Sequence, residues 1–178
     1  MKLFVAIPLP PVLTQLLVRL DPQLPGVRWL RPEQMHLTLS FLGHVRSDAE
    51  TALREKLAGI RFQSFFLPVC GVGVFPGKGK PTVFWVGVGS GHPQLFHVYK
   101  RVQEAALGAG LEPDLRSWRP HITIARCRDV PAEAVRPFLK TNAKFDAGLV
   151  PVKSFALYSS AASAAGSVYT EELVVRAA

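Results

Sequence analysis

The sequence has little cysteine and no long hydrophobic run, and each of these lacks excludes a class of protein. Cys70 and Cys127 are its only cysteines and form no C-x-x-C pair, so we expect buried thiols rather than a disulfide scaffold. No apolar stretch approaches the roughly 20 residues that a membrane-spanning helix needs. The N-terminal MKLFVAIPLPP has Lys2 as its one early charge and no small-residue cleavage site after its prolines. We therefore predict a buried first strand instead of a signal peptide, and a cytoplasmic protein without membrane contact.

Acidic residues are scarce beside basic ones. The 178 residues include 21 Lys plus Arg against 13 Asp plus Glu, which gives a net charge of +8 with His neutral and a sequence pI near 9.9. This imbalance favours polyanionic partners, with nucleic acid first among them, although an Arg-rich composition alone is weak support. Hydrophobic residues make up 48% of the chain, enough to build a core.

Hydrophobic periodicity and Pro/Gly punctuation predict helices interleaved with short strands. Ser47 followed by Glu50 has the spacing of a capping box, and the small-residue segment 159–167 is expected to be a mobile loop between the last two strands. This order favours an α+β protein with antiparallel sheets, organised as one two-lobed domain over residues 1–178. The predicted helices are 11–20, 47–60, 92–107 and 131–139, and the predicted strands are 3–7, 36–42, a hairpin within 65–88, 121–127 and two or three after 145.

One short motif occurs twice. Residues 36–39 read HLTL and residues 121–124 read HITI, a separation of 121 − 36 = 85 residues, close to half the chain. On a strand, residues i and i+2 point to the same face, so each motif presents one imidazole beside one hydroxyl. The alternate residues, Leu or Ile, are expected to face the core.

Two such pairs facing each other across a cleft suit phosphodiester chemistry. Two histidines can divide the duties of general acid and general base near neutral pH, and threonine hydroxyls can donate hydrogen bonds to phosphoryl oxygens. A single His-x-Thr segment is common on strands, because Thr is a favoured strand residue. The second copy, placed similarly in the other half of a basic chain, is what makes His36, Thr38, His121 and Thr123 candidate catalytic residues.

At these residues the sequence resembles the RNA 2′,3′-cyclic phosphodiesterases (ThpR/LigT type) of the two-histidine phosphoesterase superfamily. The resemblance extends over nearly the whole chain, through KLFVAIPLP, VRWLRPEQMHLTLSFLG, GVGVFPGKGKPTVFWVGV, RPHITIARCR and ALYSS…GSVYTEEL. It implies a bilobal, pseudo-twofold fold in which two antiparallel sheets line a central cleft, with helices outside. It also implies metal-independent opening of 2′,3′-cyclic phosphates on RNA ends or nucleotides to 2′-phosphates, without a cofactor, by a monomer active in RNA or tRNA processing. Reversible 2′-5′ RNA ligation is the reverse chemistry and is implied as a side activity.

The resemblance also implies roles for single residues. His36 would protonate the departing 3′ oxygen and His121 would activate water, although the reverse division is chemically possible. Thr38 and Thr123 would hold the phosphate. Arg126 corresponds to an arginine expected to contact the phosphate, but it is five residues from His121 and would need a bulge or a strand end to turn it toward the same face.

Three further residues complete the comparison with this family. Phe41 corresponds to an aromatic position that stacks on a base, and a core phenylalanine is an equally good interpretation. Ser159 stands where members often have Arg, which removes a nucleotide contact at that position, and Tyr158 beside it is expected to be structural.

A non-catalytic RNA- or nucleotide-binding module with the same fold is the main alternative, but a binding role does not require two titratable groups. His92 and His97 are five residues apart on a predicted helix, where metal ligands prefer spacings of three or four, so no metal site is predicted. GVGVFPGKGK lacks the strand–loop–helix context and the Ser/Thr of a nucleotide-binding P-loop.

Overall fold

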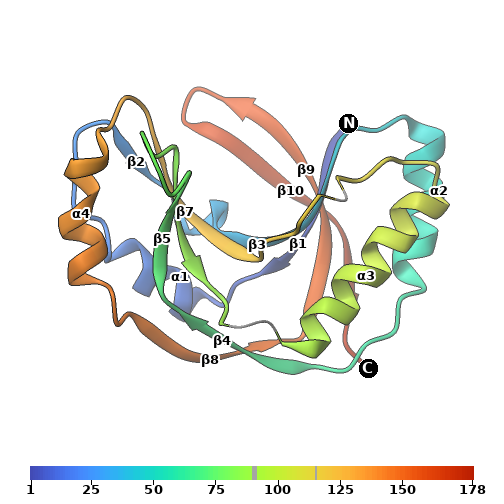
Figure 1. The fold of residues 1–178 in the computed structure, drawn as a ribbon. Helices are drawn as coiled ribbons and strands as arrows, with labels where there is room; N and C mark the ends of the chain where they lie inside the picture. Colours follow the sequence, from blue (N-terminus) through green and yellow to red (C-terminus); the bar gives the residue numbers. More distant parts are fainter. Residues whose placement is uncertain (90–91, 115) are drawn as a thin grey trace.

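The larger of two sheets in the described part of the chain runs through both halves of the molecule (Figure 1). A computed structural model describes residues 1–89, 92–114 and 116–178. The larger sheet has the strand order β10-β9-β1-β3-β7-β6-β5, with β2 paired to β7, and the smaller sheet pairs β4 with β8. The strands are β1 (Lys2–Pro8), β2 (Val27–Trp29), β3 (His36–His44), β4 (Phe65–Cys70), β5 (Val72–Phe75), β6 (Val83–Gly87), β7 (His121–Cys127), β8 (Asp146–Val152), β9 (Ser154–Ser163) and β10 (Gly166–Arg176).

The helices stand at two sides of the sheets. In Figure 1, α2 (Ser47–Ala58) and α3 (Pro93–Gly108) lie together at one side, and α1 (Pro11–Val18) and α4 (Ala132–Thr141) lie at the other. All pairings between the named strands are antiparallel, so the predicted α+β fold with antiparallel sheets and outer helices is confirmed. The two halves of the larger sheet join through one register pair, Leu37 with Ile122. Among the described residues, no helix is both long and apolar enough to cross a membrane.

Two local predictions need correction. Arg46, and not Ser47, is the N-cap of α2, because the amide of Glu50 already bonds to the Arg46 carbonyl at 2.9 Å. The Glu50 side chain turns away from the helix start to pair with Arg54, with 2.7 Å between Oε1 and the guanidinium. Arg54 also pairs with Glu172 of β10, so the Glu50 carboxylate takes part in an ion-pair network with the sheet and not in the helix cap.

The segment 159–167 is mostly strand instead of loop. Its residues pair across β9 and β10, from Ser160 opposite Tyr169 to Ser163 opposite Gly166, and Ser163 Oγ donates to the Gly166 carbonyl at 2.6 Å. Small side chains lack a β preference of their own, so the pairing with a neighbouring strand decides their conformation. The predicted hairpin within 65–88 is β5 with β6, whereas β4 pairs with β8 instead.

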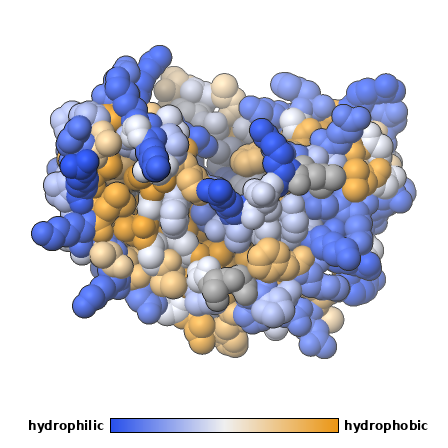
Figure 2. Space-filling view, in the orientation of Figure 1, coloured by the Kyte–Doolittle hydropathy of each residue, from blue (hydrophilic) through white to orange (hydrophobic). Residues whose placement is uncertain are grey.

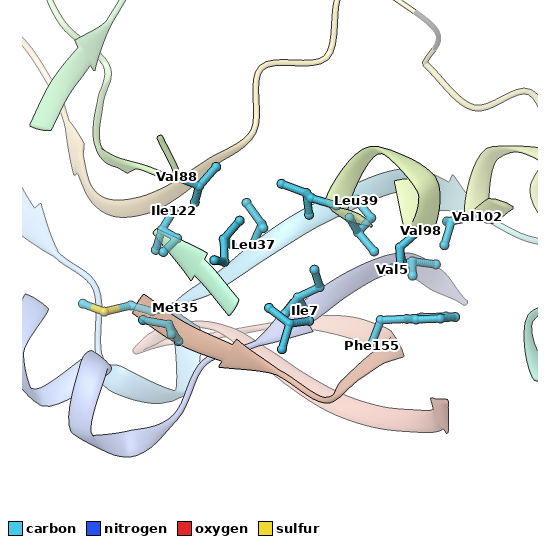
Figure 3. Packing of buried hydrophobic residues seen from close by; sticks show 14 of the residues in the cluster. Val5, Ile7, Met35, Leu37, Leu39, Val88, Val98, Val102, Ile122 and Phe155 are labelled. Atoms are coloured by element: carbon cyan, nitrogen blue, oxygen red, sulfur yellow. The ribbon is translucent and has the colours of Figure 1, made fainter. Parts of the chain in front are cut away.

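The core lies beneath the motif strands. Leu37, Leu39, Ile122 and Ile124 are all fully or almost fully buried, as the alternation predicts. Figure 3 shows Leu37 and Ile122 side by side, with Val98 and Val102 of α3 packed toward the neighbouring strands. Hydrophilic residues cover much of the face in Figure 2, interrupted by smaller hydrophobic areas. Because the apolar residues of the motif strands face the core, their polar side chains lie on the opposite face of the sheet.

Candidate active site

The two motif strands meet where their motifs begin. Because β3 and β7 are antiparallel and Leu37 pairs with Ile122, the same register brings His36 beside Thr123 and Thr38 beside His121. These four side chains alternate with the buried residues and share the opposite face of the sheet. The structure therefore gathers the four predicted residues into one array, with a histidine and a threonine in each row.

Two adjoining cavities open over this array. The first, about 230 Å³, holds His36, Thr123 and Arg126, and the second, about 370 Å³, holds His121. Thr38 and Phe41 line both. The array is thus the floor of one cleft with two compartments. His36 lines the first compartment and His121 lines the second.

A β-bulge follows each motif at the same position. In the pairing of β1 with β3 the register passes over Leu39, and in that of β6 with β7 it passes over Ile124. An extra residue in one strand shifts the following side chains to the other face. Phe41 and Arg126, each five residues after its histidine, consequently line the cleft.

The bulge at Ile124 is the irregularity that Arg126 needs in order to face the cleft, as the sequence analysis states. The exposure of Phe41 also separates its two interpretations, since a side chain that is 66% exposed is not part of the core.

Each bulge leaves a main-chain carbonyl outside the strand ladder, and each finds a donor. Buried Gln103 of α3 donates from Nε2 to the Leu39 carbonyl at 3.0 Å, and its Oε1 accepts from Ser40 Oγ at 3.3 Å. The Ile124 carbonyl accepts from the amide of Leu30 at 2.8 Å. Since an unpaired buried polar group is costly, these bonds stabilise the bulges that direct Phe41 and Arg126.

Each imidazole is held by the backbone two residues before it. His121 Nδ1 lies 2.6 Å from the Arg119 carbonyl, and His36 is hydrogen-bonded to the backbone of Gln34. A carbonyl accepts from the ring N–H, which orients the ring and fixes its tautomer. The second ring nitrogen of His121 is then the one available to bind substrate.

Aromatic rings surround His36. Phe4 stacks on it with ring centroids 4.8 Å apart, and Tyr169 meets it edge-on at 5.3 Å. Tyr158 stacks on Phe4 from β9, at 5.2 Å. The pKa of His36 is lowered from 6.5 to about 4, chiefly because the ring is buried. The hydrogen bond to the Gln34 backbone opposes this shift, and the charges of Arg126 and His121 add to it.

The surroundings of His121 are more open. Phe75 meets its ring edge-on at 5.0 Å. Burial lowers the pKa of His121 below 6.5, the Arg119 carbonyl opposes this shift, and the charge of Arg126 adds to it. The charge of Arg126 thus makes both imidazoles harder to protonate.

Several cleft residues were missed by the sequence. Ser160 and Ser167 of the β9–β10 hairpin line the first compartment, and Phe75, Trp118 and Arg119 line the second. Neither motif nor periodicity marks them, because only the fold brings them to the cleft. Ser159 points elsewhere, donating from Oγ to Glu172 Oε1 at 2.6 Å.

Potential metal ligands are dispersed in the described part of the chain. Over residues 1–89, 92–114 and 116–178, no three His, Cys, Asp or Glu side chains gather as ligands of one ion. His92 instead caps α3, its Nδ1 accepting from the amide of Gln94 at 3.1 Å, and stacks on Phe65.

Comparison with known proteins agrees with this duplicated site. The model of the LigT like Phosphoesterase family matches the chain twice, over residues 6–85 and 86–169, and each match contains one His-x-Thr motif. The two halves therefore correspond to two copies of one family unit, as the matching bulges also indicate.

Curated relatives and a solved structure extend the comparison. The RNA 2′,3′-cyclic phosphodiesterase of Aeropyrum pernix is 32% identical over 85% of this chain and 87% of its own length. The protein of the same name from Thermus thermophilus is 35% identical over 96% of this chain and 87% of its own length. The crystal structure of E. coli LigT complexed with 3′-AMP has a TM-score of 0.82 and 26% identity, covering 99% of this chain and 97% of that chain. With the duplicated family match and relatives of this similarity, the chain belongs to the LigT like Phosphoesterase family and is an enzyme of the phosphoesterase class.

Proposed function

We propose that this protein hydrolyses 2′,3′-cyclic phosphates of RNA ends or nucleosides to 2′-phosphates, without a metal ion. The observation that carries the proposal is the array on β3 and β7, in which two backbone-anchored imidazoles and two hydroxyls share one cleft. Two imidazoles supply an acid and a base, and hydroxyls supply donors for phosphoryl oxygens.

The substrate class is supported by charge and by the relatives. The first compartment contains Lys2 and Arg126 and no carboxylate among its lining residues, which favours an anion. Its exposed Phe41 offers a ring on which a base can stack. The curated relatives are named RNA 2′,3′-cyclic phosphodiesterases, and E. coli LigT was crystallised with 3′-AMP.

The roles of the two histidines follow from in-line displacement. His121 takes a proton from water as the water oxygen bonds to phosphorus, and the bond from phosphorus to the 3′ oxygen breaks. His36 gives its proton to that oxygen, leaving a 2′-phosphate and a free 3′-hydroxyl. Thr38 and Thr123 donate to the non-bridging oxygens, and Arg126 balances the charge that develops on them. With a nucleoside 5′-hydroxyl in place of water, the same steps give 2′-5′ ligation as a side reaction.

Substrate binding favours the protonated form of His36, which takes its proton from the solvent. With a pKa of about 4, His36 is neutral at neutral pH before substrate binds. A bound phosphate anion stabilises the imidazolium and raises the pKa of both histidines. The acid is thus charged when substrate is present.

The direct test is hydrolysis of nucleoside 2′,3′-cyclic phosphates and of a cyclic-phosphate-ended RNA in excess EDTA. We expect a 2′-phosphate product and undiminished turnover. His36→Ala and His121→Ala are each expected to lower kcat by about a hundredfold or more. A 3′-phosphate product, or activity that needs an added divalent ion, contradicts the mechanism, and binding without any hydrolysis favours the alternative of a non-catalytic module.

A second substrate assigns the acid. Catechol cyclic phosphate opens to release a phenol, which departs with less need of a proton than a ribose hydroxyl. His36→Ala is therefore expected to lose much less activity on catechol cyclic phosphate than on the nucleotide, whereas His121→Ala loses activity on both. The opposite pattern reverses the two roles.

A further inference from the structure

The two histidines are anchored alike, but the residues that anchor them differ. Each imidazole is held by the backbone two residues before it, at Gln34 for His36 and at Arg119 for His121. The Arg119 side chain is exposed, whereas Gln34 is only 5% exposed. The residue that anchors His36 therefore also has a buried polar side chain, whose hydrogen bonds connect it to other parts of the fold.

Both ends of the Gln34 amide are hydrogen-bonded. Gln34 ends the short 3-10 helix η1 (Pro32–Gln34), and its Oε1 accepts from the Arg31 amide at 3.1 Å. Its Nε2 donates to the Ser167 carbonyl of β10 at 3.0 Å. Because a buried amide without partners is costly, these two bonds hold the side chain between η1 and the β9–β10 hairpin.

The bond from Gln34 reaches the part of the hairpin that extends beyond the sheet. The pairing of β9 with β1 ends at Ser159, and among the described residues the outer parts of β9 and β10 pair with each other alone (Figure 1). A two-stranded hairpin is marginally stable by itself. Contacts with η1 and its N-cap support it: the bond from Gln34 to Ser167, and a bond from Arg31 Nη1 to the Ala165 carbonyl at 3.3 Å.

The hairpin has a glycine where it approaches Gln34. Gly166 has a φ of +106°, and a Cβ at this position would lie 3.2 Å from Gln34 Nε2 and 2.7 Å from Arg28 Nη1. Another residue would be strained in this conformation and would push the hairpin away from η1. Glycine therefore allows the close approach that the bond from Gln34 to Ser167 needs.

The same hairpin forms one wall of the compartment that His36 lines. Ser160, Ser167 and Tyr169 all face this compartment. The Tyr169 ring also meets the His36 ring edge-on at 5.3 Å. Gln34 thus acts on His36 in two ways, directly through its backbone and indirectly through the hairpin that carries Tyr169.

We infer that Gln34 is a positioning residue for His36, an inference that rests on the proposed function. Its backbone orients the imidazole, and its side chain fixes the hairpin that packs against the ring. Together these contacts aim the acid at the leaving 3′ oxygen. A displacement of about 1 Å at a catalytic group can lower turnover by about a hundredfold, so a residue that does not touch the substrate can still control the rate.

The test compares two leaving groups in Gln34→Leu, which keeps a side chain of similar size and removes both amide bonds. We expect kcat on adenosine 2′,3′-cyclic phosphate to fall about tenfold. On catechol cyclic phosphate kcat should change little, because the phenol departs with less need of an acid. The pattern should follow that of His36→Ala on a smaller scale, whereas a purely structural role would lower both kcat values alike.

Three further variants serve as partner and controls. Gly166→Ala disturbs the same contact from the hairpin side while Gln34 stays in place, and it should cause the same selective loss. Val152→Ala, in the core at the smaller sheet, should lower the unfolding free energy and leave the ratio of the two kcat values unchanged. Gln63→Leu, at an exposed glutamine outside the cleft, should change neither kcat value.

Three results overturn the inference. An unchanged kcat on the nucleotide in Gln34→Leu means that this residue does not position the acid. An equal loss on both substrates in Gln34→Leu, while His36→Ala discriminates between them, means that Gln34 only stabilises the fold. A wild-type protein that does not hydrolyse the nucleotide, or a His36→Ala variant that loses both activities alike, overturns the proposed function or its assigned acid, and is distinct from the first two results.

Discussion

Burial of His36 should make the folded protein less stable in acid, and the substitution His36→Gln should remove this part of the pH dependence. The unfolded chain has the ordinary histidine pKa of 6.5, whereas the folded protein holds the pKa of His36 at about 4. Between these values the unfolded state binds a proton that the folded state does not. Stability is therefore complete above the unfolded pKa and falls as the pH falls toward the folded one.

The size of the effect follows from the two pKa values. Lowering the pH from about 7.5 to about 4.5 should remove about 2 to 3 kcal/mol of unfolding free energy through His36 alone. His121 adds to the loss with the same sign, since its pKa is also lowered. Other groups titrate in this range, so the difference between two proteins is the quantity to measure.

The assay is urea unfolding of wild type and His36→Gln at both pH values. Glutamine does not titrate, so its packing penalty is independent of pH, and the stability gap between the proteins should shrink by about 2 to 3 kcal/mol at the lower pH. His44→Gln, at the exposed end of the same strand, controls for the loss of an imidazole. A gap that stays constant between the two pH values refutes the argument that His36 is held neutral by burial.

The remaining predictions concern the pH profile, the bulge and the uptake of protons. Because both histidines have pKa values below 6.5 and the productive pair carries one proton, kcat/KM should peak in mild acid and fall about tenfold per unit above about pH 6.5; a flat profile through neutral pH contradicts this. Gln103→Leu leaves the Leu39 carbonyl and the Ser40 hydroxyl without their Gln103 partner. It should lower the unfolding free energy measured in urea by about 2 to 4 kcal/mol, and it should raise KM more than it lowers kcat. Binding of adenosine 2′-phosphate at neutral pH should take up protons, seen in calorimetry as a heat that varies with the ionisation enthalpy of the buffer and that His36→Gln diminishes.

Several features of the site depend on the pairing of strands that lie far apart in the sequence, β3 and β7 among them (Figure 1). The motif strands are 85 residues apart in sequence and touch through a single register pair, so no local pattern reports that His36 faces Thr123. The same holds for β4, which leaves its sequence neighbours to pair with β8. Which strands pair depends on how the whole chain buries its apolar residues, and a short segment of sequence does not carry that information.

The bulges show this limit most clearly. The sequence states only that Arg126 lies five residues after His121, which on a regular strand faces away from the cleft. Whether a strand bulges depends on how many residues its partner offers, and on whether a donor such as Gln103 or the Leu30 amide is present to satisfy the freed carbonyl. The sequence could therefore state the condition for Arg126 and could not decide it.

By itself, the sequence determined the repeated unit: a histidine and a threonine on one strand face, with Leu or Ile on the other, twice in a basic chain. It could do so because strand alternation is a local property of two or three residues. Only the tertiary structure decided that the two units lie in one array, that their bulges turn Phe41 and Arg126 into the same cleft, and that aromatic rings lower the pKa of His36. Those features arise from contacts between segments far apart in the chain, where burial and register are set by the whole fold.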